Sequence, residues 1–226
     1  MELRLSEQLL LLAFNEKQGI IYTSKAGVFK YALAGAIIQE LMTHEKLELE
    51  EKAVKLIDKG PTDDPVLDKA IDILAQSTKE KKIQHWISKL GGKAKTFKKI
   101  LFNDLVNKGV LKQREDRDFR VPGGDRFKLW FDGPVKHLRD HLRDILVHGN
   151  KADQKSLRLI GLAQACKLTR KLFKDSKEQE IAGRRMEELT ENDPFKEAIR
   201  KIVNSNRLNI VYTAVTAAAM VAKEAC

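Results

Sequence analysis

One stretch of this chain, residues 81–103, limits the possible folds more than any other, because two helical patterns meet in it. Apolar residues recur at helical spacing on both sides of the pair Gly91-Gly92. The pattern predicts two amphipathic helices, over 81–90 and 94–108, joined at these glycines. Their apolar stripes are Ile83, Trp86, Ile87 and Leu90 in the first helix and Phe97, Ile100, Leu101 and Leu105 in the second.

The same stretch carries seven lysines and neither Asp nor Glu. Lys95, Lys98 and Lys99 have the spacing i, i+3, i+4, which places them on one face of the second helix. Cations in the first turns of a helix oppose its dipole. A lysine cluster there, beside a Gly-Gly turn with free backbone N–H groups, indicates an anion-binding site. The alternative interpretation is an ordinary solvated lysine face.

The overall charge also favours anionic partners. The chain has 42 Lys and Arg against 32 Asp and Glu, a formal net charge of +10. Such an excess suits nucleic acid, an anionic membrane face or acidic proteins, and it does not choose among them. The two cysteines, Cys166 and Cys226, lie far apart in the sequence, which is typical of a reduced, intracellular protein. Cys166 lies in an apolar run and is predicted to be a core thiol.

The remaining patterns predict many helices and few strands. Thr23 or Ser24 is expected to cap a long helix to about 42, and Asp63 or Asp64 a helix to about 76. Strands over 110–114 and 126–131 predict a β-hairpin with its turn at 122–125. The sequence therefore predicts one mainly α domain over 1–226 with a hairpin attached. Further helices are expected over 3–14, 132–148, 155–173, 177–189, 195–203 and 208–223, and short strands over 20–22, 47–49 and 53–57.

Two segments bear on targeting and membrane insertion. The apolar part of the N-terminal segment is too short and too interrupted by charges for a signal peptide. The late apolar run over 208–222 is rich in Ala and Thr and is predicted to be a buried helix, not a membrane span.

Catalytic and metal-binding patterns are weak. His137 and His141 share a helix face, but a zinc site needs a third ligand, and neither HExxH nor CxxC occurs. A structural or surface role is expected for both histidines. The sequence contains no G-x-S-x-G elbow and no phosphate-binding Gly-rich loop. We therefore expect neither an enzyme nor a bound metal or cofactor.

The two tryptophans occupy different patterns. Trp86 falls on an apolar helical stripe, and Trp130 lies in the second hairpin strand. Both are predicted to lie in the core, although Trp130 could instead present an aromatic ring to a membrane or a partner.

A second functional class fits the same elements. A lysine-rich helix followed by a hairpin with a basic, Gly-containing tip is also typical of a winged-helix DNA reader. In that hypothesis the helix of Lys95, Lys98 and Lys99 enters the major groove and the hairpin is the wing. Against it, such a module needs far fewer residues than this chain has, so nucleic acid is the less favoured partner.

Four segments spread over most of the chain carry a further signal: LSEQLLLLAFNEKQG, YALAGAIIQELMTHEKLEL, FNDLVNKGVL and SLRLIGLAQACKL. These segments resemble the Golgi phosphoprotein 3 family, and the form YALAGA is closer to its prokaryotic members. The resemblance implies a mostly α-helical domain around a central helix bundle, with a protruding β-hairpin. Eukaryotic members bind phosphatidylinositol 4-phosphate on the cytosolic Golgi face and act as adaptors for glycosyltransferase tails. The four segments follow one another in the family's order.

The resemblance also implies a site and a location. The family's headgroup site combines a Trp, an Arg and two basic residues; the basic pair matches Lys95 and Lys98, the Trp position falls on Lys25 and the Arg position on Ala34. We therefore expect a lipid-headgroup site of Lys95, Lys98, Lys99 and Lys25 that lacks selectivity for the 4-phosphate. The expected protein is cytoplasmic and peripheral on the cytosolic face of a membrane, the Golgi in a eukaryote. Its expected partners are anionic lipid, the tails of membrane enzymes and a second copy bound through the hairpin.

Overall fold

The computed structural model describes residues 2–21, 27–51, 53–77, 79–113 and 127–205 of the chain. Most of these residues are helical, so the fold is mainly α, as the sequence predicted. The helices are α1 (Leu5–Ala13), α2 (Phe29–Thr43), α3 (Pro65–Ala75), α4 (Ile83–Gly91), α5 (Ala94–Asn107), α6 (Gly133–Leu146), α7 (Gln154–Ala165), α8 (Thr169–Leu172) and α9 (Ser176–Leu189), and a further helix covers 194–205. The strands are β1 (Phe14–Asn15), β2 (Ile20–Ile21), β3 (Leu47–Glu50), β4 (Ala53–Leu56), β5 (Lys81–Lys82), β6 (Leu111–Gln113) and β7 (Phe127–Leu129).

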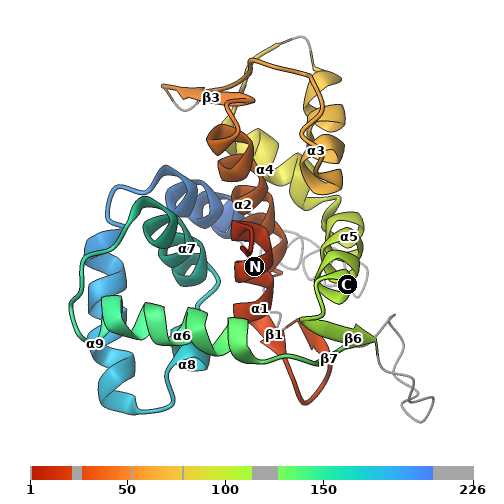
Figure 1. The fold of residues 1–226 in the computed structure, drawn as a ribbon. Coiled ribbons are helices and arrows are strands. Elements are labelled where there is room, and N and C mark those ends of the chain that lie inside the picture. Colours follow the sequence, from red (N-terminus) through yellow and green to blue (C-terminus); the bar gives the residue numbers. More distant parts are fainter. Residues whose placement is uncertain (1, 22–26, 52, 78, 114–126, 206–226) are drawn as a thin grey trace, which may run out of the picture.

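The helix α2 lies at the centre of the fold (Figure 1). Its sequence is small and apolar on every side, and almost every residue from Phe29 to Leu41 is buried. A helix that is apolar all round must be surrounded by other elements, and α2 contacts α1, α3, α4, α5 and α7. The other helices therefore form a bundle around α2, with α6 to α9 on one side of it and α3 to α5 on the other (Figure 1).

The strands form three small antiparallel sheets, β1-β2, β3-β4-β5 and β6-β7. The β6-β7 pair confirms the predicted hairpin, with Leu111 opposite Leu129 and Gln113 opposite Phe127. Its predicted tip at 122–125 lies outside the described residues. The sheet β3-β4-β5 confirms the two short strands expected over 47–49 and 53–57 and adds Lys81–Lys82 as a third.

Several helix boundaries differ from the prediction; the helix expected over 81–90, for example, begins at Ile83, because Lys81–Lys82 forms β5. The helix α2 begins at Phe29 after the N-cap Val28, later than the expected caps Thr23 and Ser24, which lie outside the described residues. The helix expected over 155–173 is broken into α7 and α8. The break occurs at Lys167, whose φ of 57° ends the helix without the glycine or proline that would mark a break in sequence.

Two core predictions are confirmed. Trp86 is buried on the inner face of α4, and Cys166 is buried at the end of α7. Burial raises the pKa of the Cys166 thiol to about 12, so it behaves as an inert core residue. None of the helices in the described ranges combines the length and apolar character that crossing a bilayer requires. The predicted helix over 208–223 lies outside these ranges.

Candidate functional site

The junction between α4 and α5 is tighter than the sequence predicted. Gly92 continues in the right-handed helical region with φ −63°, and its N–H donates to Ser88 O at 3.0 Å. The Lys93 N–H donates to Leu90 O at 2.8 Å. The expectation of free N–H groups at the Gly-Gly pair is therefore wrong, because Gly91 lies within α4 and the amide of Gly92 completes its last turn.

The start of α5 still lacks anionic compensation. Its N-cap, Lys93, makes no side-chain capping bond, and its first turn contains no acidic residue. The helix dipole therefore leaves a partial positive charge at this end, next to the first of its lysines.

The three predicted lysines share the outer face of α5. Phe97, Leu101 and Leu105 are buried on its inner face, which turns the lysine stripe outward. Lys95 and Lys99 are exposed and Lys98 is half-buried. No carboxylate in the described part of the chain pairs with any of the three lysines. The structure thus brings Lys95, Lys98 and Lys99 together as an uncompensated cationic face, here called the lysine face.

The start of α2 lies beside the end of α4, three residues before α5 begins. A Cβ built on Gly91 would lie 2.8 Å from Tyr31 Cδ1 and 3.3 Å from Lys30 O. Only glycine allows this approach of the two helices. The first turn of α2 also lacks an acidic residue and a side-chain cap. Two uncapped helix starts therefore lie close to the lysine face.

Lys30 is a cation that the sequence interpretation missed. It is exposed at the start of α2, with its Nζ 4.8 Å from the centroid of the Tyr31 ring. The sequence contained one signal for Lys30: it follows closely after Lys25, the position that aligns with the family's Trp. Lys25, the predicted member from that segment, lies outside the described residues, and Ala34 is 1% exposed within α2.

The hairpin at the other end of α5 presents an aromatic surface. Trp130 is 63% exposed, so its predicted core position is wrong. The alternation along β7 explains this: Phe127 is buried and stacks on Phe102 with ring centroids 4.2 Å apart, which turns residues of the other parity outward. The ring of Trp130 instead lies under two lysines, with Lys112 Nζ at 4.8 Å and Lys128 Nζ at 5.9 Å from its centroid.

The two histidines predicted to share a face lie on the exposed side of α6. His141 Nε2 lies 2.9 Å from Ser156 Oγ, and His137 is exposed. Asp153 accepts from Ser156 N at 2.7 Å as the N-cap of α7. Within the described residues, no cluster of three His, Cys, Asp or Glu side chains could hold a metal ion.

Comparisons with known proteins match most of the chain. A family model described as Golgi phosphoprotein 3 (GPP34) matches residues 5–205. The vacuolar protein sorting-associated protein 74 of Schizosaccharomyces pombe is 27% identical over an aligned length of 159 residues; the match covers 61% of this chain and 44% of that protein. The chain thus spans less than half the length of this relative.

Proposed function

Since this chain belongs to the Golgi phosphoprotein 3 family, we propose that it is a peripheral, non-enzymatic membrane protein that binds anionic phospholipid headgroups. The observation that carries the proposal is the lysine face at the start of α5. Lys95, Lys98 and Lys99 lie there without a carboxylate partner among the described residues. Their ammonium groups supply the phosphate contacts, and Lys25 adds a further cation from the segment before α2.

The lysine face alone gives weak binding. A lysine near an anionic surface contributes about 1 kcal/mol, so three lysines contribute too little for stable attachment. The exposed ring of Trp130, between Lys112 and Lys128, adds a side chain of the kind enriched at membrane interfaces. Because α5, β6 and β7 follow one another down one side of the molecule (Figure 1), a membrane along that side contacts both features.

The proposed site favours charge over headgroup geometry. Ammonium groups are point charges without the planar fork that lets Arg bind phosphate through two parallel hydrogen bonds. Lys25 and Ala34 stand where the family pattern has Trp and Arg. The protein therefore binds several anionic lipids, with little preference for phosphatidylinositol 4-phosphate over its isomers.

The proposed partners and location follow from the family. The relative's name places that protein in vacuolar protein sorting, which supports an adaptor role for this chain with the cytoplasmic tails of membrane proteins. The chain acts as one domain on the cytosolic face of a membrane, the Golgi in a eukaryote, and a second copy associates through the hairpin.

A parallel titration tests lipid binding against DNA binding. The untagged protein is titrated at physiological salt with three kinds of anionic vesicle, which carry phosphatidylinositol 4-phosphate, phosphatidylinositol 3-phosphate or phosphatidylserine. Neutral vesicles and duplex DNA are titrated in parallel. We expect binding to all three anionic vesicles, with affinities within about tenfold of one another, and none to neutral vesicles. Tighter binding to duplex DNA, with a steep salt dependence, would support the winged-helix alternative instead. A strong preference for phosphatidylinositol 4-phosphate would contradict the proposal, because it would show that the site selects its headgroup by geometry.

A further inference from the structure

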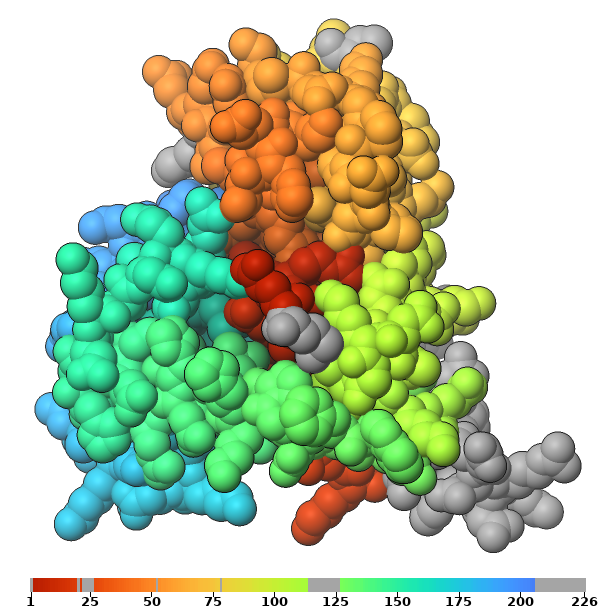
Figure 2. All heavy atoms as spheres, in the orientation of Figure 1, coloured from red at the N-terminus to blue at the C-terminus, as the bar shows by residue number. Residues whose placement is uncertain are grey.

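A pocket between α1, α2, α3 and α7 lies apart from the lysine face. Its volume is about 440 Å³, which is within the usual range of small-molecule sites. In Figure 2 the N-terminal residues, in red, lie in a hollow between the orange end of α2 and the teal α7. Leu5, Thr43, Leu67 and Arg158 line the pocket, one from each of the four helices.

Part of the pocket lining is apolar. Leu3, Leu5 and Leu67 contribute to it, and Leu3 and Leu5 keep 7% and 5% of their surface exposed. The side chains of Lys155 and Arg158 add their aliphatic stems to the lining. An alkyl group in the pocket would remove apolar surface from water, which favours binding.

Arg158 is a cation of this pocket that has no carboxylate partner among the described residues. Its side chain is half-buried, and one guanidinium N–H donates to Thr43 Oγ1. None of its nitrogen atoms is both buried and unpartnered, so its remaining N–H groups are open to solvent. A guanidinium carries five N–H donors in a planar fork that matches a carboxylate. Most of these donors are therefore available to an anionic ligand.

The other two cations of the lining differ in availability. Arg4 already binds three carboxylates, so its charge is used within the protein. Lys155 Nζ lies 2.8 Å from Glu2 Oε1, but the Glu2 side chain is 88% exposed. An ion pair this exposed contributes little to stability. Lys155 can therefore leave Glu2 for a ligand and act as a second cation beside Arg158.

Glu40 is the carboxyl group of the lining that opposes a bound anion. Its Oε1 accepts from Ser6 N at 2.8 Å, and its Oε2 is closed to solvent. Burial raises the pKa of Glu40 to about 7. Part of the protein therefore has a neutral Glu40 at neutral pH, which lowers the repulsion, and the repulsion falls further as the pH falls.

We propose that this pocket binds an alkyl carboxylate, with the carboxylate held by Arg158 and Lys155 and the alkyl chain against Leu3 and Leu5. The ligand supplies the anionic partner that Arg158 lacks among the described residues. The site is independent of the lipid-headgroup site, because Lys95, Lys98 and Lys99 do not line the pocket.

An NMR titration with three six-carbon probes tests the head group: hexanoate, hexanol and hexylammonium. The protein carries no N-terminal tag, because Glu2 and Leu3 line the pocket. We expect hexanoate to bind at least about tenfold more tightly than the other two probes, and to shift the backbone amide signals of Thr43 and Lys155. Equal or tighter binding of hexanol or hexylammonium, or no hexanoate binding, would overturn the proposal. So would hexanoate shifts confined to α5, because they would place the anion on the lysine face.

The length of the probe tests the apolar part of the pocket. Each methylene that leaves water should tighten binding by about threefold. Hexanoate is therefore expected to bind about tenfold more tightly than butanoate. Equal affinities would mean that the chain stays in water, and would rule out an alkyl carboxylate as the class of ligand.

Variants test the assigned cations. Arg158→Gln removes the charge and the fork but keeps a donor for Thr43, and is expected to weaken hexanoate binding by about tenfold or more. Lys155→Gln should weaken it by about threefold, and it remains informative if Arg158→Gln does not fold. Arg184→Gln is the matched control, since Arg184 is 71% exposed in α9 and does not line the pocket. Wild-type affinity in Arg158→Gln or Lys155→Gln, or an equal loss in Arg184→Gln, would refute the assignment.

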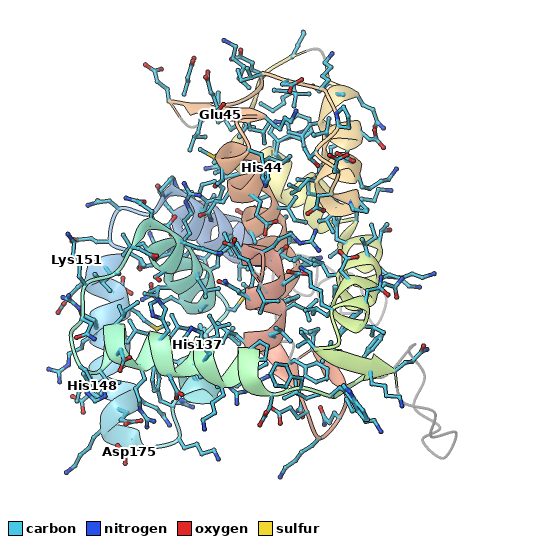
Figure 3. The ribbon with its side chains drawn as sticks, viewed as in Figure 1. His44, Glu45, His137, His148, Lys151 and Asp175 are labelled. Carbon is cyan, nitrogen blue, oxygen red and sulfur yellow. The ribbon has the colours of Figure 1, made fainter. Side chains whose placement is uncertain are left out.

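The pH dependence gives an independent readout. A carboxylate probe stays ionised between pH 6 and pH 8, whereas Glu40 loses negative charge as the pH falls through this range. His44, labelled at the end of α2 in Figure 3, lines the pocket and gains positive charge in the same range. Hexanoate should therefore bind about threefold or more tightly at pH 6 than at pH 8, and Glu40→Gln/His44→Gln should lose this difference. Weaker binding at pH 6 would contradict the proposed site. The other charged groups around the pocket and Glu40 are Glu2, Arg4, Glu7, Asp64, Asp104, Lys108, Lys155 and Arg158.

Discussion

At the scale of single residues, the buried carboxyl of Glu40 is expected to make the stability of this protein depend on pH. Its pKa is raised to about 7 because burial disfavours the carboxylate, although Ser6 and Arg4 act in the opposite direction. A carboxyl whose folded pKa exceeds its unfolded value stabilises the fold most below the unfolded value. That contribution is lost as the pH rises through the folded pKa.

Glu40→Gln should therefore change the pH dependence of stability. Between pH 5 and pH 8 the wild type is expected to lose about 2–3 kcal/mol more unfolding free energy than the variant. Glutamine keeps an acceptor for Ser6 and cannot ionise. Urea denaturation at the two pH values measures the difference. Parallel pH profiles for wild type and variant would show that Glu40 is not the group that titrates.

At the scale of elements, one glycine governs how α2 meets the end of α4. A Cβ on Gly91 would lie 2.8 Å from Tyr31 Cδ1, whereas a Cβ on Gly183 within α9 would have no neighbour within 4 Å. Gly91→Ala should therefore destabilise the protein by about 1–3 kcal/mol through overpacking. Gly183→Ala should stabilise it by about 0.5–1 kcal/mol through helix propensity.

Thermal and urea unfolding of the two alanine variants measure these changes. Because the Gly91 contact also holds the start of α2 beside the lysine face, Gly91→Ala should weaken vesicle binding too. A neutral Gly91→Ala would mean that the two helices are not this close.

Arg4 joins three elements that lie far apart in sequence. Its guanidinium binds Glu7 in α1, Asp64 at the N-cap of α3 and Asp104 in α5. Although burial opposes it, these bonds raise the pKa of Arg4 above its usual value. Its side chain is only 19% exposed, so the network is poorly screened by solvent.

Arg4→Met should cost about 3–5 kcal/mol of unfolding free energy, because it leaves three carboxylates short of their shared cation. Lys69→Met is the surface control, since Lys69 pairs with Asp72 at 3.5 Å on an exposed face, and should cost less than about 1 kcal/mol. Urea midpoints compare the two variants. Similar losses would mean that the Arg4 network contributes no more than a surface pair.

At the scale of the whole molecule, features that depend on residues close in sequence could be predicted, whereas contacts between distant residues could not. The shared face of the α5 lysines and a helix cap at Asp63 or Asp64 depend on residues within a few positions of one another, and both were predicted; the structure caps α3 with Asp64. The Ser6–Glu40 hydrogen bonds and the bonds of Arg4 to Asp64 and Asp104 join residues 34 to 100 positions apart, and no local pattern points to them. The Trp130 prediction failed because the burial of Phe127, which sets the strand parity, depends on stacking against Phe102 in α5.

The formal net charge of +10 also affects any measurement of binding to anionic vesicles. Nonspecific attraction to any anionic surface is expected from the charge alone. A test of the lysine face must therefore compare variants of equal net charge.

The most direct measurement is co-sedimentation of such variants with anionic vesicles. Lys95→Glu/Lys98→Glu removes the proposed headgroup contacts, and Lys151→Glu/Lys174→Glu makes the same charge change at exposed residues away from α5; Figure 3 shows Lys151 across the molecule from that helix. We predict that the first variant loses about tenfold or more in vesicle affinity, while the second stays within about threefold of wild type. Equal losses in both variants, or wild-type binding by Lys95→Glu/Lys98→Glu, would contradict the assignment of the headgroup site to α5.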